Sequence, residues 1–275
     1  YSLLAQTDQD FIIWVSARHE DRQCPILRDF RHWLEMIGFK VVFTFSGVCF
    51  WDDKYPDDVA YTRLIDAVHG SMGELLNTIG EADTILMTIQ PSDDCYHREM
   101  VKETKEKFWV DSSLQCFGYR QGYVMDYLTG RLKQWNPQTT PPFYTIKFSR
   151  EVFTDPLKHV KYIGPYKSHE YVKDYLKAEY SDKRGFIVGT HLDNISTVFD
   201  HPYAGEETKG TELDLLLTDF FGPNQFTPIE FPFSLRRVLF NALPYAVKRK
   251  LRYLAGEKKW LLRPVFSIIY NFLRA

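Results

Sequence analysis

Short apolar runs alternate with stretches of helical periodicity over residues 1–90, and this alternation constrains the fold more than any other feature. Runs rich in β-branched residues lie at 11–17, 39–45 and 84–89. Between the first two, apolar residues recur at three- and four-residue steps over 26–37, and Gly38 can end a helix there. The β-α-β-α-β pattern predicts an α/β fold with a mixed, mostly parallel sheet flanked by helices. Ligands of such sheets bind at the carboxyl ends of the strands.

The middle of the chain has a different pattern. Leu128-Thr129-Gly130 separates the apolar runs 117–127 and 131–135, which predicts a β-hairpin and a partly antiparallel sheet in this region. The elements expected further on are a strand at 143–148, a helix at 168–180 and a buried strand at 185–190.

The composition is that of a globular protein, with 44% apolar and 25% charged residues among 275. No apolar run reaches the 18 residues that a membrane-spanning helix needs. The four cysteines form no C-x-x-C pair and have no disulfide-framework spacing. Because reduced thiols are typical of the cytoplasm, we expect a cytoplasmic chain.

Charge is distributed unevenly along the chain. Residues 231–275 contain ten Lys and Arg but only one acid, a net charge of +9, so that the total of −2 leaves −11 for residues 1–230. We therefore expect an acidic domain at 1–230 followed by a basic, amphipathic, helical extension at 231–275, and no binding to nucleic acid. The extension suits either attachment to an anionic membrane surface or packing against the domain with a solvated basic face.

The strongest candidate for chemistry is the segment after the third strand, which contains Ser92, Asp93 and Asp94. Adjacent carboxylates at a strand end can hold Mg²⁺ or Mn²⁺, which uses one or two protein carboxylates together with water and phosphate oxygens. The alternative is an acidic pair in a solvated turn. A second acidic group is interpreted as a solvated loop and consists of Asp52, Asp53, Asp57 and Asp58.

Three further residues are candidates by position. Glu170 opens the helix predicted at 168–180 and can act as a general base or complement the helix terminus. His191 follows a predicted strand and is a candidate ligand to the same metal, with His201 in reserve. A histidine at a strand end can equally be a hydrogen-bonded structural residue.

Four stretches, taken in order, resemble the family-2-like glycosyltransferases and in particular their rhamnosyltransferase group. They are the opening S-L-L-A-Q-T-D-Q-D-F at 2–11, the acidic segment at 92–94, the pair formed by 142–144 and 168–170, and H-L-D-N-I-S-T at 191–197. The resemblance covers about residues 1–205. Two departures stand out: Pro91 occupies the position of the first motif aspartate, and the chain begins after the strand and helix that hold the nucleotide base in these enzymes.

The resemblance implies a GT-A-like nucleotide-diphospho-sugar transferase fold and an inverting hexosyl- or deoxyhexosyltransferase that depends on Mn²⁺ or Mg²⁺. It would move a sugar from a nucleotide-sugar donor to a glycan or lipid-linked acceptor at the cytoplasmic face of a membrane. Glu170 would be the base. The metal ligands would be Asp93, Asp94 and His191, and the donor contacts Ser92, Asp93, Asp94, Tyr144 and Asn194. The alternatives are a non-catalytic carbohydrate- or nucleotide-binding module and, from the extension alone, a membrane-tethered scaffold.

Overall fold

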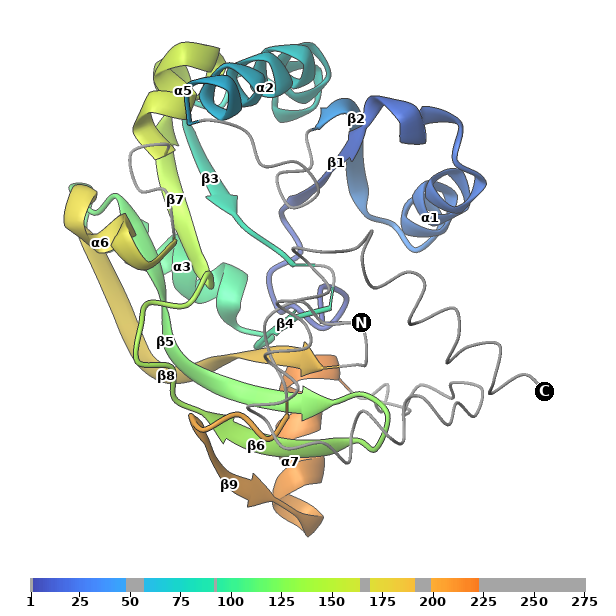
Figure 1. Ribbon diagram of the computed structural model, residues 1–275, viewed down its shortest axis with the longest axis vertical. Coiled ribbons are helices and arrows are strands. Elements are labelled where there is room, and N and C mark those ends of the chain that lie inside the picture. Colours follow the sequence, from blue (N-terminus) through green and yellow to red (C-terminus); the bar gives the residue numbers. More distant parts are fainter. Residues whose placement is uncertain (1, 48–56, 92, 164–168, 191–198, 223–275) are drawn as a thin grey trace, which may run out of the picture.

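The computed structural model describes residues 2–47, 57–91, 93–163, 169–190 and 199–222, with side chains from residue 62 onwards in the second range (Figure 1). The strands are β1 (Ile12–Arg18), β2 (Lys40–Gly47), β3 (Thr84–Thr88), β4 (Cys95–Tyr96), β5 (Cys116–Asp126), β6 (Arg131–Trp135), β7 (Tyr144–Ser149), β8 (Ala178–Thr190) and β9 (Ala204–Thr208). The helices are α1 (Pro25–Met36), α2 (Asp57–Ile79), α3 (Met100–Val110), α4 (Arg150–Thr154), α5 (Pro156–Ile163), α6 (Val172–Tyr175) and α7 (Gly210–Phe221), with short 3-10 turns η1 (His19–Gln23) and η3 (His169–Tyr171).

The strands form two sheets, and the larger one is mostly antiparallel. β1 and β2 make a separate parallel pair. The seven-stranded sheet runs β3-β7-β5-β6-β9, with β8 beside β5 and β4 beside β8, and within it only β5 and β8 are parallel among the described residues. The structure is thus mixed α/β with flanking helices, and the prediction of a mostly parallel sheet was wrong.

A short connection explains one of the antiparallel pairs. β5 and β6 are joined by residues 127–130, and a parallel pair would need a crossover of about a dozen residues or more. β3 follows the helical crossover α2, yet it pairs antiparallel with β7 instead of joining β2. The period of a strand's sequence identifies the strand but not its partner.

Several local predictions are confirmed. The first three predicted strands match β1, β2 and β3, the helix at 26–37 matches α1, and the turn at 128–130 joins β5 to β6. In the second acidic group, Asp57 and Asp58 begin α2 instead of lying in a loop, and Asp52 and Asp53 lie outside the described residues.

The helix predicted at 168–180 is much shorter than expected. α6 ends at Tyr175 and β8 begins at Ala178, because the long open edge of β5 pairs with this part of the chain. Phe117 of β5, for example, is opposite Glu179. Pairing between distant segments here overrides the local helical period.

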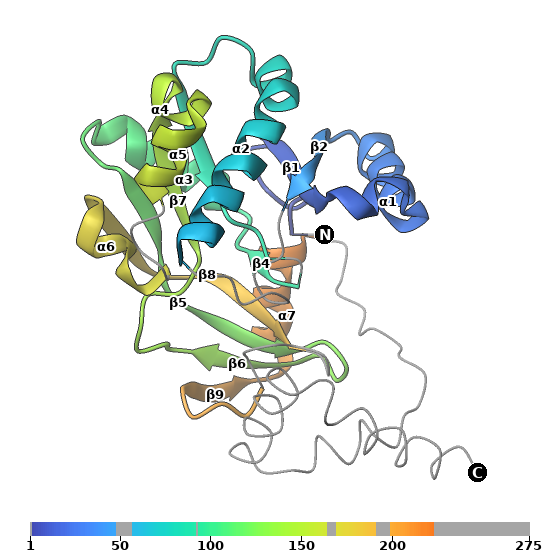
Figure 2. The same cartoon turned by 45° about the horizontal axis from the view of Figure 1, so that its top comes forward.

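The core lies on the two faces of the larger sheet. Residues of β3 and β7 pack beneath α2 and α5, while Phe220 and Phe221 of α7 pack against β5, β6 and β8. Between them, the rings of Phe143 and Phe186 stack at a centroid distance of 3.8 Å. Figure 2 shows α7 beside β4 and the ends of β5 and β8. The packing of α7 therefore holds β4, the next strand after β3 along the chain, in place. Within the described part of the chain, no helix has both the length and the apolar character needed to cross a bilayer.

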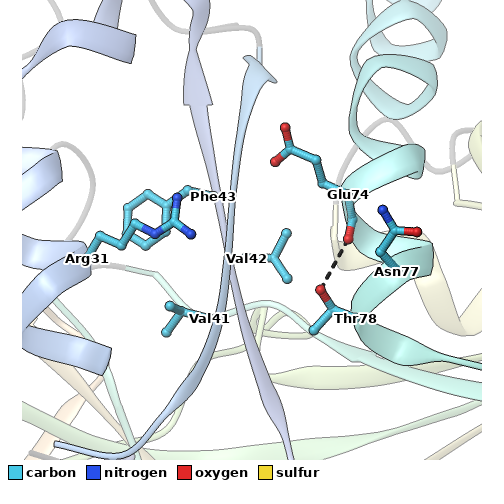
Figure 3. A pocket seen from close by; sticks show the side chains of 7 residues that line it. All are labelled: Arg31, Val41, Val42, Phe43, Glu74, Asn77 and Thr78. Carbon is cyan, nitrogen blue, oxygen red and sulfur yellow. Dashed lines mark hydrogen bonds between the residues drawn. The ribbon is translucent and has the colours of Figure 1, made fainter. Parts of the chain in front are cut away.

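A groove of about 340 Å³ opens on the smaller sheet (Figure 3). Its lining comes from α1, β2 and α2 and consists of Arg31, Val41, Val42, Phe43, Glu74, Asn77 and Thr78. Figure 3 shows Arg31 and Glu74 on opposite sides of β2. No residue of the segment that joins β3 to β4 lines this groove, which is therefore separate from the candidate site described next.

Candidate functional site

The chain between β3 and β4 is described at residues 89–91, 93 and 94; these residues, here named the acidic turn, include Asp93 and Asp94. Gln90 stabilises it from within, because its side-chain Nε2 donates to the carbonyl oxygens of Pro91 at 2.9 Å and of Asp94 at 2.7 Å. Both carboxylates are half-buried. The acidic turn is therefore a folded feature with its own hydrogen bonds.

The ends of β5 and β8 hold the acidic turn from outside. The Gly189 N–H donates to Oδ1 of Asp94 at 3.0 Å, and the Tyr127 hydroxyl donates to the carbonyl oxygen of Asp93 at 2.7 Å. A Cβ atom on Gly189 would lie 1.9 Å from that same carbonyl oxygen, so the close approach requires glycine. Tyr127 in turn donates its backbone N–H to Thr190 at 3.0 Å.

Burial and repulsion make Asp94 unusual. Burial, and then the neighbouring charge of Asp93, raise the pKa of Asp94 to about 7, although the Gly189 N–H lowers it. Burial also raises the pKa of the Cys95 thiol beside it. A half-buried carboxylate whose ionisation is opposed by burial and by a neighbouring negative charge is a place where a divalent cation would be stabilising, because the cation would neutralise the second charge.

The donor set fits Mg²⁺ or Mn²⁺ better than a structural metal. The described residues contain no group of three or more His, Cys, Asp or Glu side chains arranged to hold an ion. A closed zinc site needs four such ligands, whereas Mg²⁺ keeps several waters and uses one or two carboxylates with substrate phosphates. Asp93 and Asp94 meet this smaller requirement.

The raised pKa of Asp94 predicts a pH-dependent stability. Between an unfolded pKa of ~3.9 and a folded pKa of about 7, the folded state binds more protons than the unfolded state, so the free energy of unfolding falls as pH rises through this window. Asp94→Asn cannot ionise but keeps an oxygen that accepts from Gly189. We expect the free energy of unfolding of the variant to rise relative to that of wild type by on the order of 1–4 kcal/mol between pH 4 and pH 8.

Urea unfolding at both pH values, with a chelator present, measures this difference. The control is Asp214→Asn, which changes an exposed carboxylate on α7. Parallel pH profiles for wild type and Asp94→Asn would contradict the prediction.

Tyr144, another proposed donor contact, has its side chain in the hydrophobic core. Tyr144 begins β7 with a buried side chain in the core beneath α2, and burial followed by Cys116 raises the pKa of its hydroxyl to about 12. A phenol in that position serves packing. Ser92, His191 and Asn194 lie outside the described residues, and their assignments stay predictions.

His201 lies at a different part of the sheet. Its ring packs edge-on against Trp135 at a centroid distance of 4.8 Å, and its Nδ1 accepts the N–H of Tyr203 at 3.1 Å. Trp135 is opposite Gly122 of β5, whereas Gly189 is opposite Met125, three residues further along β5. That offset is ~10 Å along the strand, with two strand spacings across the sheet besides. Since an Mg²⁺ ligand lies ~2 Å from the ion, the structure does not bring His201 to the acidic turn.

Glu170 is also apart from the acidic turn. It belongs to η3, where His169 Nδ1 lies 2.6 Å from the carbonyl oxygen of Thr140 in the segment before β7. Figures 1 and 2 both show α6, which continues η3, at the edge of the molecule, and β4, which continues the acidic turn, near its centre. This separation weighs against a shared reaction centre.

Sequence reasoning missed Tyr127 and Gly189. A glycine inside an otherwise apolar strand is a sign of close backbone approach, and Gly189 has that signature. The partner of the close approach could not be read from the sequence, because it depends on the register of β8 against β5. Tyr127 has no local signal beyond its place before the hairpin turn.

In comparisons with known proteins, no family model matches the chain, and no curated protein matches it.

Proposed function

We propose that this chain is a metal-dependent inverting glycosyltransferase with a GT-A-like arrangement, which uses a nucleotide-sugar donor. The observation that carries the proposal is the acidic turn: two adjacent, half-buried carboxylates directly after β3, held in place by a backbone N–H from β8 and a hydroxyl that follows β5. Residues 92–94 resemble the motif that binds the metal and the donor diphosphate in these enzymes, which supports the same role for the acidic turn.

The chain's own residues have distinct tasks in this proposal. Asp93 would hold the cation through its carboxylate, and Asp94, whose Oδ1 accepts from the Gly189 N–H, would contribute its second oxygen. A bound Mn²⁺ or Mg²⁺ supplies the positive charge that stabilises a departing nucleoside diphosphate. The protein then acts mainly by positioning and charge stabilisation, and one displacement inverts the anomeric centre.

A donor panel tests the proposal directly. Purified protein is incubated with nucleotide sugars that differ in base and sugar, with Mn²⁺ or with chelator, and release of nucleoside diphosphate is measured. We expect at least one donor to be hydrolysed slowly in the presence of Mn²⁺ and not in chelator. Absence of Mn²⁺-dependent release and of donor binding across the panel would overturn the proposal.

Glu170→Gln decides whether Glu170 takes part in the reaction. The separation of α6 from β4 predicts a transfer rate within about three-fold of wild type, because removal of a general base typically costs 10²- to 10⁴-fold. A stability change of ~0.3–1 kcal/mol would match a carboxylate that only complements the local turn. Transfer rate and thermal stability are measured on the same preparation, and a rate loss above ~100-fold would return the role of base to Glu170.

A second candidate is a non-catalytic carbohydrate- or nucleotide-binding module on the same fold. The observations that favour it are Pro91 in place of the first motif aspartate and the separation of η3 from the acidic turn. Donor binding without any Mn²⁺-dependent release would support this module over the enzyme. Residues 231–275 lie outside the described residues, and both their membrane attachment and their packing against the domain stay predictions.

A further inference from the structure

The Tyr127 side chain is buried at the junction of three segments. It follows β5 directly, its ring is only 8% exposed, and its hydroxyl lies 3.4 Å from the Cys95 sulfur as well as 2.7 Å from the Asp93 carbonyl oxygen. Backbone hydrogen bonds fix its main chain, since its N–H donates to Thr190 and the turn after it is closed by the Gly130 N–H on the carbonyl of Asp126. The hydroxyl is therefore held by a rigid support.

Tyr127, Gly189 and the carbonyl of Asp93 are packed in direct succession. A Cβ on Gly189 would lie 2.4 Å from the Tyr127 ring and 1.9 Å from the Asp93 carbonyl oxygen. The hydroxyl reaches past this glycine to the same carbonyl. Neither neighbour can move without disturbing the other, so the position of the Asp93 backbone is set by the hairpin end of β5.

The acceptor distinguishes Tyr127 from Tyr162, a half-buried tyrosine, whereas the buried Tyr96 likewise donates to a carbonyl of the acidic turn, that of Ile89 at 2.8 Å. The Tyr162 hydroxyl also donates to a main-chain carbonyl, that of Lys147 at 3.2 Å, but this carbonyl belongs to the middle of β7, which its own strand pairing already fixes. The carbonyl of Asp93 lies outside the described strand ladders, on a residue that the proposed function makes a cation ligand. A hydrogen bond there orients a functional side chain.

We propose that Tyr127 is a positioning residue of the cation site, whose hydroxyl holds the Asp93 backbone so that the Asp93 carboxylate is aimed at the divalent ion. The inference rests on the proposed function, because it concerns the same acidic turn. In this proposal the end of β5 controls the affinity for the cation, although it lies outside every motif of the family resemblance.

The test compares Tyr127→Phe with Tyr162→Phe, since each variant loses one hydroxyl that donates to a main-chain carbonyl. Mn²⁺ binding is followed by the loss of the electron paramagnetic resonance signal of free Mn²⁺, with no donor present. Amide hydrogen exchange of residues 89–95 is measured in chelator. We expect Tyr127→Phe to bind Mn²⁺ at least 10-fold more weakly and to exchange faster at 89–95, as for other partners that orient metal ligands. Tyr162→Phe should match wild type in both.

A third measurement separates positioning from general damage. The rate of donor hydrolysis is recorded against Mn²⁺ concentration, and a positioning role predicts that Tyr127→Phe reaches the wild-type rate once Mn²⁺ saturates the weakened site. Mn²⁺ affinity equal to wild type in Tyr127→Phe would overturn the inference and leave the proposed function standing. A wild-type protein that neither binds Mn²⁺ nor hydrolyses any donor in its presence would overturn both. Equal weakening in the two variants would show a loss of overall stability and would also overturn the inference.

Discussion

Asp93→Asn is expected to lose Mn²⁺-dependent donor turnover by at least about 100-fold, because the amide removes the negative charge that binds the cation. The fold should be retained. Asp93 is half-buried at the surface of the acidic turn, and its charge raises the pKa of the neighbouring Asp94, so that its removal relieves repulsion near neutral pH. Turnover at saturating donor and the melting temperature in chelator are the two measurements.

Asp83→Asn is the matched control, since Asp83 is an exposed aspartate immediately before β3, at the opposite end of the same strand. It should behave as wild type in both measurements. Turnover that is equal in Asp93→Asn and wild type over the whole Mn²⁺ range would remove the metal assignment. A large drop in melting temperature would instead show that the Asp93 side chain supports the fold.

Elements that depend on local sequence were predictable, and their partners were not. β1, β2, β3 and α1 follow from runs and periods within about a dozen residues. The sheet direction depends on which distant strands meet, and β3 pairs with β7, which lies more than fifty residues away along the chain. The same limit explains the shortened helix before β8, where the edge of β5 decides the conformation.

The candidate site divides in the same way. The place of Asp93 and Asp94 directly after a strand was predictable because it is a local property, and their role as cation ligands stays a prediction. Tyr144 and His201 were proposed from their sequence neighbourhoods, but the structure places one in the core and the other against Trp135. Tyr127 was missed because its contact with the acidic turn depends on the registers of β4 and β5 against β8.

Gly189→Ala is expected to have the largest effect of any single methyl group added at the site. The new Cβ would lie 1.9 Å from the Asp93 carbonyl oxygen and 2.4 Å from the Tyr127 ring. Relief needs movement of main chain, since the oxygen belongs to the backbone and the tyrosine follows a buried strand. Overpacking of this kind typically costs about 1–3 kcal/mol, and we expect the upper end of that range. Movement of the acidic turn should also weaken Mn²⁺ binding by at least about 10-fold.

Gly73→Ala is the control that makes this result interpretable. Gly73 lies in α2 with no atom within 4 Å of the position its Cβ would take, so alanine there should stabilise the protein by ~0.5–1 kcal/mol through its higher helix propensity. Urea unfolding and Mn²⁺ titration are measured on both variants. Because each variant adds one methyl group, the difference between them separates the effect of the steric clash at Gly189 from the general effect of replacing glycine with alanine. If Gly189→Ala matched Gly73→Ala in stability and wild type in Mn²⁺ affinity, the acidic turn would not be pressed against β8, and the glycine would have no part in setting the geometry of the two carboxylates.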